Sequence, residues 1–329
     1  MPIAVISNLN SHRNQRLAGP VRALLETSPE VIHVESRDPS ELPALLDALR
    51  RQGVSHLAVN GGDGTAQHTL TALLNGAWPD PPTLAVLPGG TTNMTAHDLN
   101  GGKLGLLPAL RAFLAAARRA TPPRLMPETR RIIRVQCDGH DDQYGFCFGL
   151  GAIVRGIRYC HERVYQMRLP NELAPGAAML RAFYGIARRE PVFAEGLPVT
   201  LRYADGESGA QSEQLDTSFM CISTLRRLFL GMTPFWGSGT GDLAMTIVRE
   251  KPERLLRTLP ALLRGRPTRH LTTGNGYTSR RLDCLQIESD GEYMLDGEVF
   301  PVADSPLKLD AVTLPILALA TTPGEPSAR

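Results

Sequence analysis

The sequence predicts an α/β domain with a parallel sheet, followed by a mainly antiparallel β-sandwich domain. Two observations lead to this division. Over about the first 130 residues, short apolar segments alternate with helical patterns, which is typical of a parallel sheet covered on both faces. After a proline-rich segment, 121–127, strand-like segments follow one another with turns between them, as in antiparallel sheets. A chain of 329 residues is long enough for two such domains.

The first domain is predicted to span residues 1–128. Its helix at 39–51 illustrates the reasoning, because Asp38 is a favourable N-cap and leucines recur on one helical face after it. The remaining elements follow from the same alternation. Strands are expected at 3–6, 31–34, 57–60 and 84–87, and further helices at 17–26 and 65–74.

The second domain is predicted to span residues 129–304, and the tail 305–329 is expected to return to the first domain. A helical insertion at 154–189 and a helix at 252–264 interrupt its strands. Strands are expected at 131–137, 144–150, 198–203, 218–223, 243–248, 282–288 and 292–295.

Composition excludes several classes of protein. With 35 Lys and Arg against 33 Asp and Glu, the formal charge of +2 disfavours nucleic-acid binding by bulk electrostatics. Five cysteines without paired spacing favour reduced thiols. The uncharged start is expected to be a strand rather than a signal peptide, and the apolar run 311–320 is shorter than the ~20 residues of a membrane span. These features predict a cytoplasmic protein that is at most peripheral to a membrane.

The glycine loop Asn60-Gly61-Gly62-Asp63-Gly64-Thr65 follows a buried strand and leads directly into a helix. Glycines allow close backbone approach, and a helix start offers free N–H groups and positive potential to a phosphate. An aspartate inside such a loop would repel the phosphate unless a metal ion or a transferable proton lies between them. The loop therefore favours phosphoryl transfer, although a lone Gly-Gly would indicate only a tight turn.

A second glycine loop, Pro88-Gly89-Gly90-Thr91-Thr92-Asn93, follows the next strand in the chain. Both loops are expected at the carboxyl edge of one sheet, where they can flank a nucleotide site. Neither loop has the Walker A pattern or the dinucleotide pattern Gly-x-Gly-x-x-Gly, so an ordinary P-loop or NAD enzyme is disfavoured.

Far along the chain, Asp296-Gly297-Glu298 places two carboxylates around one glycine. Alone it would be interpreted as a hairpin turn. Together with the two glycine loops, in this order and at this separation, it resembles the diacylglycerol kinase catalytic family, which includes bacterial lipid kinases, sphingosine kinases and ceramide kinases. The first loop by itself is shared with NAD kinases and phosphofructokinases.

The resemblance implies an ATP- and Mg²⁺-dependent kinase that transfers the γ-phosphate to the hydroxyl of a lipid such as diacylglycerol, a related acylglycerol, or a ceramide or sphingoid base. It implies an amino-terminal nucleotide-binding domain and a β-sandwich that contributes to lipid recognition. Asp63 and Asp296 are the two catalytic candidates, and no choice is made between them as the base. Metal ligands are expected at Asp63 and Glu298. The nucleotide-binding residues implied are Asn8, Asn60, Gly61, Gly62, Gly64, Thr65, Gly90, Thr91, Asn93 and Glu298.

The chain also departs from the family pattern. Met94 stands where many relatives have an aspartate, and His97 and Asp98 are candidates to replace it. Gly239-Thr240-Gly241 stands where relatives have Asp-Asp-Gly before a strand, so the retention of a structural metal site is left open. Two other functions also stay open: a kinase of a soluble substrate such as NAD, and a non-catalytic lipid-binding regulatory protein of the same fold.

Two segments are candidates for lipid contact. The insertion 154–189 is rich in Leu, Met and aromatic residues and is compatible with an acyl-chain groove or with ordinary core helices. The segment 249–270 has seven Arg and Lys against two Glu, around a leucine stripe. Such a basic amphipathic helix is compatible with anionic phospholipid headgroups or with a solvated face over a buried stripe. The sequence names neither the lipid that is phosphorylated nor the oligomeric state.

Overall fold

The computed structural model of the chain describes residues 2–76, 78–118, 127–159, 174–190, 193, 195–205, 209–303 and 305–319. It divides into two compact units. Unit 1 comprises Met1–Arg130 and the carboxyl-terminal segment that starts at Thr313, and unit 2 comprises Arg131–Val312. The sequence places the corresponding boundaries after residues 128 and 304.

Unit 1 alternates strands and helices in the order that the sequence predicts. Its elements are β1 (Ile3–Asn8), α1 (His12–Glu26), β2 (Val31–Ser36), η1 (Pro39–Glu41), α2 (Leu42–Arg51), β3 (His56–Gly61), α3 (Asp63–Asn75), β4 (Thr83–Pro88), α4 (Met94–Leu99) and α5 (Leu106–Arg118). The predicted helix at 39–51 is divided between η1 and α2, and the Asp38 carboxylate accepts the Ser40 N–H as its cap (2.9 Å).

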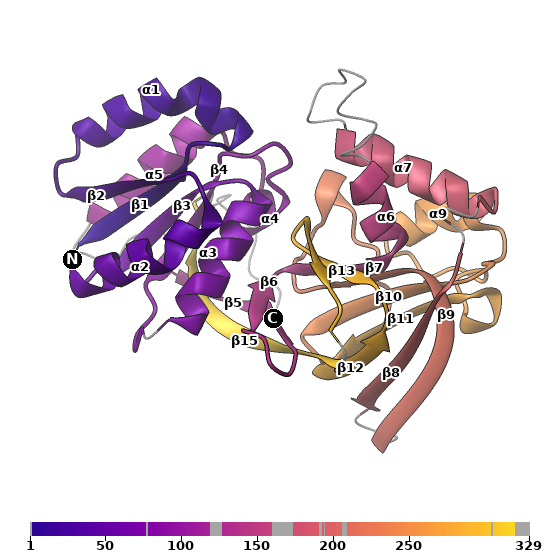
Figure 1. Cartoon of the computed structure of the whole chain (residues 1–329). Coiled ribbons are helices and arrows are strands. Elements are labelled where there is room, and N and C mark those ends of the chain that lie inside the picture. Colours follow the sequence, from indigo (N-terminus) through magenta and orange to yellow (C-terminus); the bar gives the residue numbers. More distant parts are fainter. Residues whose placement is uncertain are drawn as a thin grey trace. The chain divides into compact units, whose positions relative to one another are not determined.

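The strands of unit 1 form a parallel sheet in the order β15-β4-β3-β1-β2. Helices α1 and α5 cover one face, and α2 and α3 cover the other (Figure 1). The strands β1, β3 and β4 are buried on both faces, so they consist of nearly continuous apolar runs, as parallel strands generally do. Their core with α1 and α5 includes Val5, Leu25, Ala58, Leu87 and Phe113.

Unit 2 is built mainly from antiparallel strands. Its elements are β5 (Pro127–Gln136), which begins in unit 1, β6 (Gln143–Gly145), β7 (Cys147–Gly151), α6 (Ala152–Tyr159), α7 (Ala174–Ala187), β8 (Leu197–Asp205), β9 (Gly209–Ser223), η4 (Phe229–Gly231), β10 (Leu243–Arg249), α9 (Leu255–Leu263), η5 (Thr273–Asn275), β11 (Tyr277–Leu282), β12 (Cys284–Ser289), β13 (Glu292–Leu295), β14 (Glu298–Pro301) and β15 (Leu307–Leu317).

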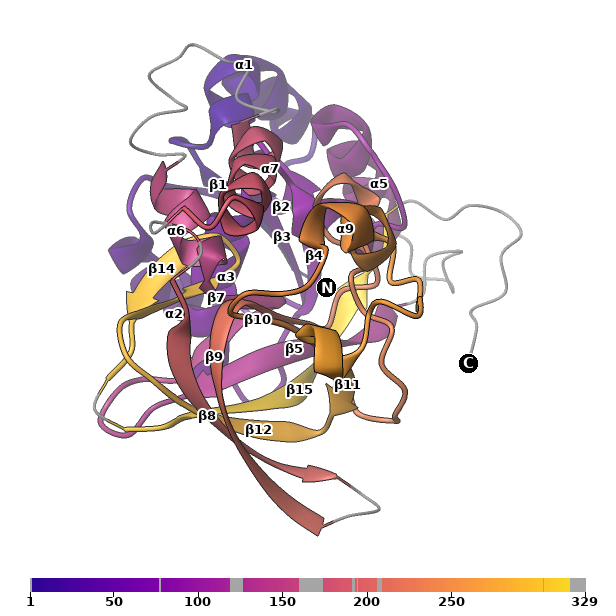
Figure 2. The same cartoon turned by 90° about the vertical axis from the view of Figure 1, so that its right-hand side faces the viewer.

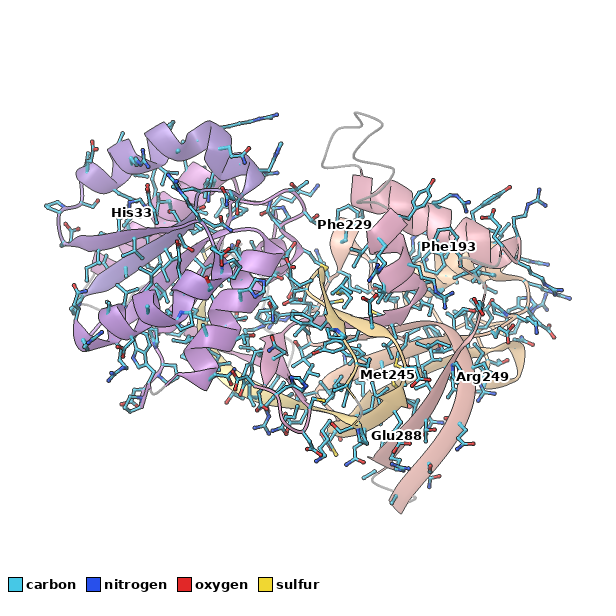
Figure 3. The ribbon with its side chains drawn as sticks, viewed as in Figure 1. His33, Phe193, Phe229, Met245, Arg249 and Glu288 are labelled. Atoms are coloured by element: carbon cyan, nitrogen blue, oxygen red, sulfur yellow. The ribbon has the colours of Figure 1, made fainter. Side chains whose placement is uncertain are left out.

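The main path of the sheet in unit 2 runs β14-β13-β7-β9-β8-β12-β15, while β10 also pairs with β9 and with β11. Phe148, Leu201, Ile222, Met245 and Leu285 belong to the core between these strands, and Figure 3 places Met245 among them. Helices α6, α7 and α9 form a second core with the strands β10 and β11. Figures 1 and 2 both show α7 and α9 at the same end of this unit.

Three sequence-based expectations need correction. The predicted strand 144–150 is interrupted at Phe146, because β6 pairs with β5 whereas β7 pairs with β9 and β13. The predicted strand 282–288 is two strands, because the chain changes partner at Asp283: Leu282 pairs with Leu243 of β10, whereas Leu285 pairs with Tyr203 of β8. The predicted insertion 154–189 contains two helices, α6 and α7, and its middle, 160–173, lies outside the described residues.

Strand β15 explains why the boundary falls later than expected. Its first half pairs with β12 of unit 2, while Ile316 near its end pairs with Leu84 of β4 in unit 1. The return of the chain is therefore one continuous strand rather than a linker. Within the described residues, no helix is both long and apolar enough to cross a membrane.

Candidate active site

The two glycine loops of the sequence begin at the carboxyl ends of adjacent strands of unit 1. Asn8 ends β1, Gly61 ends β3 and Pro88 ends β4. The chain leaves β1 for β2 on one side and returns to β3 on the other, so the sheet order reverses beside β1. In open α/β sheets, ligands bind at such switch points, outside the carboxyl ends of the strands.

The two glycine loops pack directly against each other. Gly89 donates its N–H to the carbonyl of Gly61 (2.9 Å), and a Cβ added to Gly90 would lie 2.4 Å from the Cα of Gly62. A Cβ added to Gly61 would lie 2.4 Å from the Cβ of Thr65. These contacts require glycine for close approach. The structure thus brings together the two motifs that the sequence predicts at one sheet edge.

Asn14 connects the ends of β1 and β3. The sequence analysis does not identify this residue. Its side chain is buried, and its Nδ2 donates to the carbonyls of Asn8 (2.8 Å) and Asn60 (2.9 Å). Asn60 in turn donates from Nδ2 to the hydroxyl of Ser7 (3.1 Å). No motif marks Asn14, because its role depends on the spatial meeting of the ends of β1 and β3.

Asn8 and Thr65 join the end of β1 to the first turn of α3. Asn8 Nδ2 donates to Thr65 Oγ1 (2.8 Å), which leaves the hydroxyl hydrogen of Thr65 as a donor for a ligand. Helix α3 begins after Gly62, and no side chain caps its first turn. The first N–H groups of this helix are therefore suited to an anion.

Asp63 lies in the first turn of α3, but its carboxylate caps a different helix. Oδ2 accepts the N–H of Met94 (3.1 Å), and Oδ1 accepts that of Thr95 (2.9 Å), both in the first turn of α4. Burial raises the pKa of Asp63 above its ordinary value, although the two N–H donors act in the opposite direction. Met94 thus supports Asp63 through its backbone.

Asn93 fixes the second glycine loop. Its Oδ1 accepts the N–H of Gly90, and its Nδ2 donates to the carbonyl of Gly90 (both 2.8 Å). Asn93 itself adopts a left-handed conformation (φ 51°), which asparagine tolerates better than most residues. Thr91 lies within the same turn, partly exposed. The contribution of Thr91 and Asn93 to nucleotide binding stays a prediction.

Asp98 does not replace the acidic group that is missing at Met94. Its carboxylate accepts a hydrogen bond from the Arg130 guanidinium (2.5 Å), and the two side chains are only 2% and 7% exposed. A buried charge of this kind is retained because its partner compensates it. Burial lowers the pKa of His97, which disfavours its charged form.

In unit 2, Asp296 and Gly297 form the two-residue turn between β13 and β14. Both have positive φ (50° and 95°), as in a type I′ turn. The side chain of Asp296 is buried, and its Oδ2 and Oδ1 accept the N–H groups of Phe146 (2.9 Å) and Cys147 (2.8 Å). Asp296 is therefore both a turn residue and a carboxylate anchored to the start of β7.

Stacked aromatic rings support this hairpin. Tyr293 lies between Phe148 and Phe300, with ring centroids 5.4 Å apart on each side. Burial raises the pKa of Tyr293 to about 12, so its ring stays neutral. Glu298 opens β14 opposite Leu295 and is half-buried. The two acidic residues of the third motif thus belong to one rigid hairpin.

The segment in place of the family's Asp-Asp-Gly has a packing role. A Cβ on Gly241 would lie 2.2 Å from the backbone of Leu282, so this glycine allows close approach to β11. Asp242 forms an ion pair with Arg131 (2.9 Å). Across the described ranges, no three His, Cys, Asp or Glu side chains are grouped to hold a metal ion.

Unit 2 also has a concavity of about 480 Å³ on its sheet, away from the predicted site residues. Arg202, Cys284 and Lys308 are among the residues that line it, and the strands β8, β9, β12 and β15 contribute its walls. Arg202 is paired with Glu288 and Lys308 with Asp138, so neither cation is held ready for an anionic ligand.

Unit 1 is thus an α/β domain in which two glycine loops and an aspartate meet at the carboxyl edge of the sheet. Residues 2–122 match the family model of the diacylglycerol kinase catalytic domain. The match confirms, for this part of the chain, the family that the motifs indicate. No curated protein matches the chain.

Solved structures agree with the fold over nearly the whole chain. Two similar solved structures are of proteins from Bacillus anthracis str. Sterne whose titles assign them as diacylglycerol kinases. The first has a TM-score of 0.65 at 16% identity and covers 96% of this chain and 94% of its own. The second has a TM-score of 0.63 at 16% identity and covers 96% of both chains. At these identities the likeness concerns the fold, and it confirms an α/β domain followed by a mainly antiparallel domain.

Proposed function

We propose that this protein is an ATP-dependent lipid kinase that transfers the γ-phosphate to a lipid hydroxyl, of diacylglycerol, a related acylglycerol, or a ceramide or sphingoid base. The observation that carries the proposal is the packing of Gly62 against Gly90 at the switch point of unit 1, in a domain that matches the diacylglycerol kinase catalytic model. Two glycine loops in contact beside an uncapped helix start suit a polyphosphate.

The residues present fit ATP. The uncapped first turn of α3 supplies N–H donors from Asp63, Gly64 and Thr65, and the Thr65 hydroxyl supplies another. Gly61, Gly62 and Gly90 keep the backbone free of side chains on this edge. Asn8, Asn60 and Asn93 hold the three strand ends and loops in place. In this proposal the loops bind and orient the phosphates.

The residues present also fit Mg²⁺ at the Asp63 carboxylate. Each oxygen of Asp63 accepts one backbone N–H, so each keeps lone pairs for a hard cation. Glu298 is the second proposed ligand. Mg²⁺ typically takes one or two carboxylates together with phosphates and water, so a larger cluster of acidic side chains is not required. When bound, the ion neutralises negative charge on the transferred phosphate.

Asp63 and Asp296 are the proposed acid–base groups. A kinase needs a carboxylate to orient the acceptor hydroxyl or to take its proton. Burial makes Asp63 a stronger base than an exposed aspartate, because its pKa is raised. Asp296 is held rigidly by two N–H groups, which suits the positioning of a hydroxyl. Both residues remain candidates for the base.

The test is phosphate transfer from labelled ATP with Mg²⁺ to mixed micelles that contain diacylglycerol, monoacylglycerol, ceramide, sphingosine or phosphatidylglycerol, with NAD as a soluble acceptor. Labelled lipid that disappears with Asp296→Asn would support the proposal and identify the acceptor. Label in NAD alone would establish a soluble substrate. ATP binding without any labelled product would favour a non-catalytic protein of this fold.

A further inference from the structure

One end of unit 2 combines exposed apolar side chains with an excess of positive charge. We call it the helical end and define it as α7, α9 and residues 226–232. The three large hydrophobic side chains that are exposed in the described part of the chain all belong to it: Tyr184 on α7 (46% exposed), Leu230 on η4 (67%) and Leu256 on α9 (53%). Single exposed apolar residues are ordinary, but their concentration in one region indicates an interaction surface.

The three elements of the helical end are packed together. Helices α7 and α9 are in contact, and both views show them at the same end of the unit (Figures 1 and 2). The loop that follows η4 is tied to the end of α9, because Thr233 donates its N–H to the carbonyl of Leu263 (3.0 Å). Figure 3 shows Phe229 of η4 away from Met245 in the sheet.

Helix α9 has a buried face and an exposed face. Leu255, Thr258 and Leu262 are buried, and the Thr258 hydroxyl donates to the Tyr277 hydroxyl (3.0 Å). The opposite face repeats at intervals of three and four residues and is therefore continuous. Its exposed members are Leu256, Arg257, Pro260 and Arg264. An apolar side chain thus lies among cations on a surface that the protein core does not use.

The charge on this segment is not balanced by neighbouring carboxylates. Residues 249–270 contain seven Arg and Lys and two Glu. Arg249 is paired with Glu213, and Lys251 with Glu250. Among the described residues, no ion pair is found for the other exposed cations of the segment, which are Arg254, Arg257, Arg264, Arg266 and Arg269. The surface is therefore complementary to a dense array of anions.

The η4 loop holds a leucine in solvent. Leu230 has a left-handed backbone conformation (φ 56°), which is strained for a residue with a Cβ. The loop is closed by a hydrogen bond from the Leu228 N–H to the Met232 carbonyl (2.7 Å), so the tip is fixed rather than free. Arg226 and Arg227 precede it and are exposed. Exposed leucine next to exposed arginine is the combination found on surfaces that enter the headgroup region of a bilayer.

We propose that the helical end docks on the surface of an anionic lipid bilayer, with the arginines of α9 against the headgroups and Leu230 and Leu256 inserted between them. This rests on the proposed lipid kinase function, because its acceptor is held in such a surface. A nucleic acid would use the arginines but not the leucines, and an apolar protein groove would not need the unpaired charge.

The test is co-sedimentation of the full chain with phosphatidylcholine vesicles, with and without phosphatidylglycerol, at low and high salt. Binding is expected only to the anionic vesicles and is expected to weaken with salt. Replacing Arg257 and Arg264 by Gln is expected to weaken binding about 30-fold, at ~1 kcal/mol for each cation. Replacing Leu230 and Leu256 by Ser is expected to weaken it at least about tenfold, including at high salt.

The matched control is Arg16→Gln with Arg111→Gln, which removes two exposed cations from unit 1. This control is expected to bind vesicles like the unchanged protein. An equal loss in the control, or equal binding to neutral and anionic vesicles, would overturn the proposal. A change in oligomeric state in the leucine variant, seen by analytical ultracentrifugation, would assign the helical end to contacts between copies instead.

Kinase assays separate this inference from the proposed function. With a water-soluble short-chain diacylglycerol, the arginine and leucine variants are expected to keep the unchanged protein's rate, whereas with long-chain substrate in anionic vesicles their rate falls with binding. Vesicle binding that depends on these residues in a protein with no kinase activity would refute the proposed function and leave the docking surface intact. Kinase activity with unaltered vesicle binding in both variants would refute the docking surface alone.

Discussion

Asp63 and Asp296 each present a carboxylate to two consecutive backbone N–H groups, those of Met94 and Thr95 for Asp63 and those of Phe146 and Cys147 for Asp296. Their surroundings differ. Asp63 is partly exposed in a glycine loop, whereas Asp296 is 2% exposed in a tight turn.

The two regions also differ in how far along the chain their contacts reach. The partners of Asp63 lie 31 and 32 residues away, on the next loop of the same sheet edge. The partners of Asp296 lie 150 and 149 residues away, at the start of β7, a strand that pairs with β13. The comparison indicates that similar carboxylate environments arise from local order in one case and from the complete fold in the other.

The largest expected effect is on the rate of phosphate transfer. Asp63→Asn and Asp296→Asn are each expected to lower kcat by roughly 10²–10⁴-fold, because an amide cannot take a proton from the acceptor. Lipid phosphorylation measured with saturating Mg-ATP checks this, with Asp80→Asn, at an exposed aspartate, as the control. A variant that kept its full rate would remove that aspartate from the list of bases and end the functional parallel between the two regions.

Two glycine-to-alanine substitutions test the backbone of the second glycine loop and that of the turn between β13 and β14. Gly90→Ala is expected to destabilise unit 1 by roughly 1–3 kcal/mol and to raise KM for ATP, because its Cβ would meet the backbone of Gly62. A Cβ added to Gly297 would meet nothing within 4 Å. Because its φ is 95°, Gly297→Ala is still expected to lower the free energy of unfolding by roughly 1–2 kcal/mol, with no change in KM for ATP.

Thermal unfolding and ATP titration measure both effects. Gly102→Ala is the control, since it has open space around it and no positive φ. Equal KM values for the Gly90 and Gly297 variants would contradict the assignment of Gly90 to the nucleotide edge.

The stability of the two aspartate variants sharpens the contrast in burial. Asp296→Asn is expected to lower the free energy of unfolding by roughly 1–3 kcal/mol, because its NH₂ group would face a buried N–H donor. Asp63→Asn is expected to be close to neutral at pH 7, since it also removes a charge that burial disfavours. Urea unfolding followed by circular dichroism measures both, and a larger loss at Asp63 would reverse the comparison.

The smallest expected effect concerns pH. Because burial raises the pKa of Asp63, the folded state holds this proton more tightly than the unfolded state does. The stability that this group contributes is full below the ordinary pKa of 3.8 and is lost as pH rises through the raised value. The unchanged protein should therefore lose stability relative to Asp63→Asn across that interval, as measured by melting temperatures over a pH series. A difference that does not vary with pH would contradict the raised pKa.

The pH dependence of activity tests the role of Asp63. If its carboxylate is the base, kcat/KM should rise with pH as that carboxylate ionises, because only the ionised form accepts a proton. Asp296→Asn should keep this acid limb at its lower rate, while Asp63→Asn should lose it. An acid limb that survives in Asp63→Asn would point to Asp296.

Much of unit 1 follows from local sequence. The strands β1, β3 and β4 are apolar runs followed by polar or glycine residues, so the order of elements and the position of both glycine loops are predictable. Asp38 as a cap and the loop from Asn60 to Thr65 depend on neighbours within a few residues. Such signals lie in the sequence because the interactions are short-ranged.

Other features were decided only when distant segments met. The change of partner at Asp283 depends on where β8 and β10 lie, and an apolar strand carries no signal for its partner. Asn14 is an ordinary helix residue until β1 and β3 bring two carbonyls to it. The sequence makes Asp98 a candidate for the acidic group of the site, but in the structure its carboxylate is paired with Arg130.

The sequence by itself determined the α/β class of the first domain, the two glycine loops and the family that the motifs indicate, because these depend on residue types at short, fixed spacings. The tertiary structure decided which groups hold Asp63 and Asp296, and which leucines are exposed at the helical end. The physical reason is that a hydrogen bond or an exposed surface belongs to a position in space, and positions far apart in the chain acquire one only by folding.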